Sequence, residues 1–131
     1  MALEYLDIDG LVQTGRFRHA VRANGRSTVY VSGQVPLDEA GECVGVGDFD
    51  AQVRQVYDNL TKILEALGVG WEAVAIMHIY IVNYTPERYA RLREIRAEYL
   101  GDILPASTVV GVTALALPEF EVEVEITVDL D

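Results

Sequence analysis

The chain has 131 residues, with 21 acidic and 10 basic side chains and a formal net charge of −11 at pH 7. Half of its residues are apolar, which is enough to build a substantial core and excludes a disordered chain. A surface this acidic repels phosphate backbones and anionic lipid heads, so we expect neither nucleic acid nor a membrane as partner. The length predicts one domain over residues 1–131.

The opening residues include acids where a secretory signal would have basic residues followed by an apolar run, so we expect a cytoplasmic protein. The longest apolar stretch, near residues 73–82, has about ten residues, against the ~20 that a membrane span needs. The single cysteine, Cys43, excludes an internal disulfide and a thiolate-rich metal site.

In chain order, strands are predicted over 5–8, 17–22 and 28–32, separated by glycine-containing turns. The next element is a helix over 50–67, because apolar residues recur there at three- and four-residue steps. Asp48 or Asp50 can cap its start.

A second helix is predicted over 85–101, with Pro86 at its first position. A strand over 74–82 is predicted before this helix, and strands over 107–115 and 120–130 are predicted after it. The last strand has apolar residues at even positions and polar residues at odd positions. The order βββαβαββ predicts an α+β or α/β two-layer sandwich, with both helices on one face of one sheet.

The strand over 74–82 is apolar at both sets of alternating positions, with Val74, Ile76, His78, Tyr80 and Val82 on one face. Two helices can cover only one side of such a sheet, so something else must cover the other side. Another copy of the chain is the simplest cover, and we expect a closed homo-oligomer. The alternative is a sheet curled enough to cover itself.

Several segments of the chain form a pattern through their order and spacing. They are the run Tyr-Val-Ser-Gly-Gln-Val-Pro over 30–36, Gln52, Asn59-Leu60, the strand over 76–82, Pro105-Ala106 and the Val-Glu-Val-Glu of 122–125. Together they resemble the YjgF/Rid family of reactive intermediate deaminases. The similarity extends from Gly15 to Val128.

The resemblance implies a chorismate-mutase-like (bacillus type) α+β fold in a homotrimer whose three sheets form a central barrel. It also implies a small-molecule site at each subunit interface. Family members hydrolyse enamine or imine intermediates such as 2-aminoacrylate to a 2-keto acid and ammonia, with no metal or organic cofactor. In that mechanism an arginine after Pro-Ala binds the substrate carboxylate, and a glutamate on the last strand orders the water and moves a proton.

Of the family's site residues, the catalytic glutamate is matched by Glu123. Ser107 follows Pro105-Ala106, where the family has the arginine, and Phe17 stands in place of a tyrosine. Arg93 occupies the position of a helix asparagine. The resemblance therefore predicts a divergent member without the usual carboxylate-binding arginine.

Other positions complete the predicted pocket. The Ser32-Gly33 turn is intact and can present backbone donors, and Val109 lies where some relatives have a cysteine. Hydrogen bonds to charged groups contribute roughly 1.5–3 kcal/mol, or about tenfold to 200-fold in affinity. The absence of the arginine should therefore weaken binding of a substrate carboxylate. Either Arg18 or Arg93 supplies a relocated cation, or the pocket has shifted to a different ligand.

We therefore hypothesise a cofactor-independent imine or enamine hydrolase of altered specificity, with Glu123 as acid and base. The alternative is a non-catalytic member that binds a small metabolite; a ribonuclease role is disfavoured by the net charge. Enclosure at an interface and its acidic neighbours should favour the protonated form of Glu123. We interpret those neighbours, Glu121 and Glu125, as a solvated row.

Overall fold

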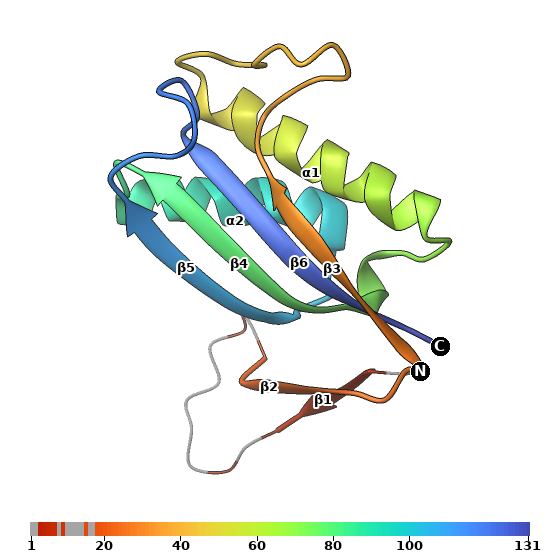
Figure 1. The fold of residues 1–131 in the computed structure, drawn as a ribbon. Helices are drawn as coiled ribbons and strands as arrows, with labels where there is room; N and C mark the ends of the chain where they lie inside the picture. The colour runs from red at the N-terminus through yellow and green to blue at the C-terminus, as the bar shows by residue number, and fades with distance from the viewer. Residues whose placement is uncertain (1–2, 8, 10–14, 16–17) are drawn as a thin grey trace.

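The computed structural model describes residues 3–7, 9, 15 and 18–131 (Figure 1). Ile8 and Phe17, both in predicted strands, lie outside the described residues. The elements are β1 (Leu3–Leu6), β2 (Ala20–Ala23), β3 (Ser27–Gln34), α1 (Phe49–Ala66), a 3-10 turn (Trp71–Ala73), β4 (Val74–Val82), α2 (Pro86–Leu100), β5 (Ala106–Val112) and β6 (Val122–Leu130). Within this part of the chain, no helix is long and apolar enough to cross a membrane.

Four strands form the main sheet in the order β3-β6-β4-β5. The pair β4–β5 is parallel and the other two pairs are antiparallel, which makes the sheet mixed. Both helices lie behind the sheet in the view of Figure 1, so its other face is turned to the viewer. This confirms the α+β two-layer sandwich.

The two N-terminal strands do not join that sheet. They pair with each other in an antiparallel two-stranded sheet, with Leu3 opposite Ala23. Beyond β2 the chain turns into β3, and the turn is held by the Gly25 amide, which donates to Asp129 Oδ2 at 2.8 Å. The prediction of one sheet for all strands was wrong here, because alternation identifies a strand but not its partner.

A polar side chain caps the N-terminus of each helix. Asp48 caps α1 by accepting a hydrogen bond from the Ala51 amide at 3.1 Å, which selects it over Asp50. Thr85 caps α2 by accepting from the Arg88 amide at 3.0 Å. These side chains satisfy amides that the first turn of a helix leaves without partners.

The core lies between the helices and one face of the sheet. Alternate residues of β4 and β6 are fully or almost fully buried there: Met77, Ile79, Ile81, Val122, Val124, Ile126 and Val128. The ladder between β4 and β6 shifts between Val74 and Ile76. This irregularity turns Val74 into the core, so its predicted place on the same face as Ile76 was wrong.

Gln52, early in α1, is completely buried and joins the loop before α1 to the segment before β6. Its amide nitrogen donates to the carbonyls of Gly45 at 3.0 Å and Glu119 at 2.8 Å. Its amide oxygen accepts from the Glu121 amide at 2.8 Å, just before β6 begins. One side chain therefore satisfies three backbone groups and fixes the start of β6 against the helix.

Replacement of Gln52 by leucine should lower the free energy of unfolding by roughly 3 kcal/mol, because three backbone groups lose their partner. Urea denaturation measures the change. The control is Gln55→Leu, whose side chain donates to the Leu37 carbonyl at 3.4 Å and to Asn59 Oδ1 at 2.8 Å. Because Gln55 is part-exposed, water can replace these partners, and its loss should stay below about 1 kcal/mol. Equal losses in the two variants would contradict this role of Gln52.

Candidate functional site

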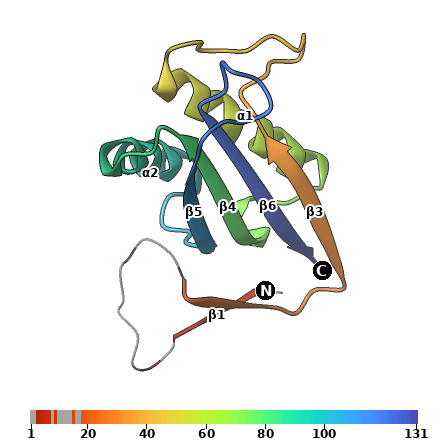
Figure 2. The same cartoon turned by 60° about the vertical axis from the view of Figure 1, so that its left-hand side comes forward.

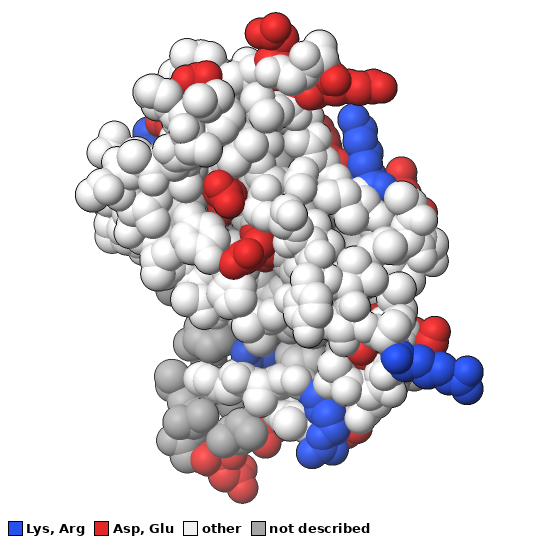
Figure 3. Space-filling view, viewed as in Figure 1, with Lys and Arg blue, Asp and Glu red and all other residues white. Residues whose placement is uncertain are grey.

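The uncovered face of the main sheet carries the predicted catalytic glutamate. Glu123 on β6 pairs with Tyr80 on β4, which in turn pairs with Val110 on β5. Figure 3 shows this face as largely uncharged, with acidic side chains near its middle. Its side chains include large exposed ones, Tyr30 at 82% and Val110 at 42% exposure.

The next row on that face is a polar cluster around Glu125. The Tyr80 hydroxyl donates to Glu125 Oε1 at 2.7 Å, and His78 Nδ1 lies 3.4 Å from the same oxygen. The hydrogen bond to Glu125 raises the pKa of Tyr80 above its usual value. Glu125 is thereby held in place beside Glu123.

Glu123 itself is set up to hold a proton. Burial raises the pKa of its carboxyl above the ordinary value, and the neighbouring charge of Glu125 raises it further. A carboxyl with a raised pKa can both donate and accept a proton nearer to neutral pH, as a general acid and base must.

Gly33 packs directly against this carboxyl. Val31 pairs with Ile126 and Gln34 with Val124, so the ladder bulges at Ser32-Gly33. The pair therefore lies in a bulge within β3 rather than in the predicted turn. A Cβ on Gly33 would overlap the carboxylate oxygen of Glu123, so a larger residue there would displace this carboxyl.

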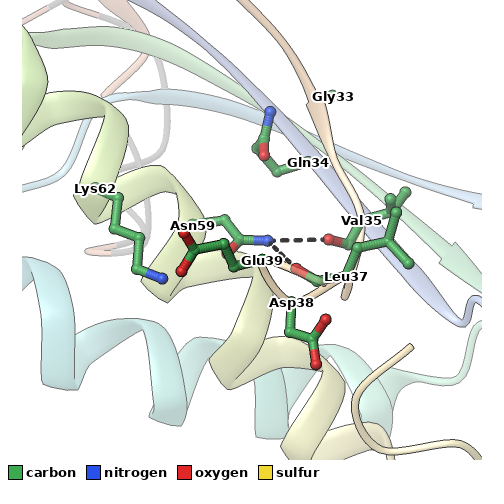
Figure 4. Close-up of a pocket in the computed structure, with 8 residues that line it drawn as sticks. All are labelled: Gly33, Gln34, Val35, Leu37, Asp38, Glu39, Asn59 and Lys62. Carbon is green, nitrogen blue, oxygen red and sulfur yellow. Dashed lines mark hydrogen bonds between the residues drawn. The ribbon is translucent and has the colours of Figure 1, made fainter. Parts of the chain in front are cut away.

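A groove of ≈ 530 Å³ opens beside Gly33, between the end of β3 and α1 (Figure 4). It is lined by Gly33, Gln34, Val35, Leu37, Asp38, Glu39, Asn59 and Lys62. Asn59 Nδ2 donates to the carbonyls of Val35 at 3.2 Å and Leu37 at 2.9 Å, which holds the loop open against the helix. Our sequence reasoning did not predict this groove, although Asn59 was part of the resemblance.

Ser107 and Val109 lie on the opposite face of the sheet. Ser107 pairs with Met77 and Val109 with Ile79, and both of these partners are buried beneath the helices. Val109 packs against the core. Ser107 Oγ is buried and has no hydrogen-bond partner in the described part of the chain.

Arg18 and Arg93, the two arginines considered as relocated cations, lie near the start of β5. The Arg18 amide donates to the Pro105 carbonyl at 3.2 Å, while its guanidinium lies 4.8 Å from the Tyr5 ring centroid and 3.8 Å from Asp7. Arg93, on α2, has its guanidinium 5.0 Å from the ring centroid of Tyr89.

The predicted site residues thus form two groups. Glu123 and Gly33 meet on and beside β6, whereas Ser107 lies on β5, two strands away and on the other face. Neighbouring strands are about 4.8 Å apart, so roughly 10 Å and the thickness of the sheet separate the groups. Within one chain they cannot contact the same small molecule.

Comparison with known proteins identifies the fold. The family model described as Endoribonuclease L-PSP matches residues 8–130. The chain belongs to the YjgF/Rid family. A Rid-family crystal structure from Yersinia pestis superposes with a TM-score of 0.92, at 34% identity, over 99% of this chain and 100% of that one.

Rid-family relatives include a RutC family protein of Pyrococcus horikoshii, 34% identical over 102 residues, which are 77% of either chain. The 3-aminoacrylate deaminase RutC of Acinetobacter baylyi is 35% identical over 96 residues, which are 73% of this chain and 74% of that one. This chain is thus similar to a deaminase of the same family.

Two further observations complete the account of this Rid-family site. The described residues contain no group of three or more His, Cys, Asp or Glu side chains that could hold a metal ion. Glu121 is not solvated as predicted: its side chain is only 19% exposed and meets Arg88 Nη2 at 2.6 Å. The sequence could not reveal that pair, because Arg88 comes from the start of α2.

If Glu125 raises the pKa of Glu123, Glu125→Gln should lower that pKa toward the ordinary glutamate value without restoring it fully, since burial remains. A carboxyl ¹³C NMR titration measures it. Glu121→Gln, just before the same strand, is the matched control and should leave the Glu123 pKa unchanged. An unaltered titration in Glu125→Gln would show that burial acts alone.

Proposed function

We propose that this protein is a cofactor-independent enamine or imine deaminase with altered substrate specificity, in which Glu123 is the acid and base. The observation that carries the proposal is the Glu123 carboxyl, whose pKa is raised and which packs against Gly33 beside a groove. Similarity to a 3-aminoacrylate deaminase supports the reaction class.

The complete site requires a second subunit. The β3 edge, beside Gly33, and the β5 edge, with Ser107, are the two outer edges of the main sheet (Figure 2). A head-to-tail contact of the β3 edge of one subunit with the β5 edge of the next repeats until the ring closes. We take that ring to be the homotrimer implied by the family, with each ligand site between two subunits and the uncovered sheet faces turned inward.

The apolar residues of the uncovered face support this assembly. Val110, Tyr80 and Tyr30 would otherwise present apolar surface to water, in contrast to the charged outer surface of the helices. Enclosure by a neighbouring subunit would remove more water from Glu123 and raise its pKa further.

The reaction needs only one shuttling carboxyl. Protonated Glu123 donates to the imine nitrogen while water adds to the imine carbon and returns a proton to the carboxylate. The carbinolamine then carries a hydroxyl and an amino group on one carbon. Glu123 protonates that amino group and takes the hydroxyl proton, so the C–N bond breaks, the C=O bond forms and ammonia leaves. The net change is imine plus water to ketone plus ammonia.

A non-catalytic metabolite-binding role is the second candidate, and the absence of a guanidinium at Ser107 is the observation that favours it. Without that group, a substrate carboxylate has one contact fewer, worth roughly 1.5–3 kcal/mol. RNA cleavage has no comparable support, because a net charge of −11 repels a phosphate backbone.

Glu123→Gln should lower kcat for ammonia release from imines generated in situ by roughly 10²- to 10⁴-fold, since the amide cannot shuttle a proton. A coupled ammonia assay measures it, with Glu42→Gln in the exposed loop as the matched control. Equal turnover by the Glu123 variant and wild type would exclude the proposed role. Failure of every imine to release ammonia, with a ligand still bound, would support the metabolite-binding alternative.

Sedimentation equilibrium should give three times the 14.5 kDa chain mass. Val110→Asp should reduce that mass, because it places a charge on the face that the ring would bury. Val46→Asp is the matched control: Val46 is even more exposed, at 68%, but lies in the loop before α1. A stable single subunit of wild type would contradict the ring.

A further inference from the structure

Arg93 has no acidic partner among the described residues of this strongly acidic protein. Most of the described arginines face a carboxylate: Arg18, Arg22, Arg54, Arg88 and Arg91 all lie within 4.0 Å of one. Arg93 is half-buried and pairs with no carboxylate that the structure describes. Its Nε is buried and makes no hydrogen bond to any described residue.

Arg93 lines a cavity of ≈ 180 Å³ at the end of α2. The lining includes Arg96, one turn further along the helix, together with Leu100, Ile103 and Leu104. Residues three apart lie on one face of a helix, so both guanidiniums border the same space. The cavity therefore combines positive charge with an apolar wall, which suits a small anion that carries an organic group.

The cavity adjoins the start of β5. Ile103 and Leu104 connect α2 to Pro105, which the Arg18 amide contacts through its carbonyl. Two residues further on, Ser107 has a buried hydroxyl without a hydrogen-bond partner in the described part of the chain. Buried polar atoms are normally satisfied, so the Ser107 hydroxyl and the Arg93 Nε, neither of which has a hydrogen-bond partner among the described residues, are available to a ligand.

We propose that Arg93 binds the carboxylate of a small 2-imino or 2-oxo acid in this cavity, in place of the cation missing at Ser107. The inference rests on the proposed function and names the substrate class. Stacking on Tyr89 engages the flat face of the guanidinium and leaves its N–H edge for the carboxylate. Arg18 Nε is also buried without a hydrogen-bond partner among the described residues, but Arg18 is the weaker candidate because Asp7 and Tyr5 already engage its guanidinium.

The test measures binding of pyruvate and of uncharged pyruvamide by ligand-observed NMR titration. Arg93→Gln should weaken pyruvate binding by about tenfold to 200-fold and change pyruvamide binding less than about twofold. Arg93→Lys keeps the charge and the stem, and should lose less than the glutamine variant. Arg91→Gln is the control on the same helix, since Arg91 is held by Asp50 at 2.8 Å and Glu94 at 3.0 Å; it should bind pyruvate as wild type does.

Three outcomes would overturn the assignment: wild type binding no pyruvate, Arg93→Gln weakening both ligands equally, or Arg18→Gln causing the selective loss instead. Equal weakening would mean that Arg93 supports the fold rather than the ligand, and circular dichroism would show it. The ammonia assay of Glu123→Gln tests the proposed function, and the pyruvate titration of Arg93→Gln tests this inference, so the two can fail separately. Pyruvate binding that depends on Arg93, in a protein that releases no ammonia, would support the anion site and count against the deaminase.

Discussion

The pairing register of β6 is the constraint on which the rest of the structure depends. It lies between β3 and β4, with valines and an isoleucine against the helices and glutamates on the other face. A slip of one residue would put the glutamates into the core and the valines into water, so the register is strongly specified. Gln52 fixes the strand's first residues, and the pairing with Tyr80 sets where Glu123 lies.

That same register gives Glu123 a property that is unfavourable for stability. Its pKa is raised in the folded protein, so between the ordinary glutamate pKa and the raised value the folded state holds a proton that the unfolded chain releases. Its contribution to stability is therefore largest at low pH and falls as pH rises through that window. Functional groups kept at a shifted pKa commonly oppose stability in this way.

The sheet also separates the pieces of the site. Gly33 lies on the edge strand β3 and Glu123 on the neighbouring β6, whereas the cavity of Arg93 adjoins the start of β5, the other edge strand, on the face that the helices cover. The ring of identical subunits that we propose would bring these pieces together, and ligand binding would then depend on assembly. In that arrangement, a serine at position 107 in place of the family's arginine would change one half of the site and leave the Glu123 half intact.

The sequence by itself determined the order of elements and the alternation of β6, and it narrowed the cap of α1 to Asp48 or Asp50, because each depends on residues close together in the chain. Through the resemblance, it also gave Glu123 as the candidate acid and base. Only the tertiary structure decided that β1 and β2 form their own sheet, that Val74 turns inward and that Arg88 neutralises Glu121. The same holds for the Gly33 contact and for the unpaired state of Arg93 among the described residues. All of these features depend on contacts between segments that are distant in sequence, and local periodicity carries no information about such contacts.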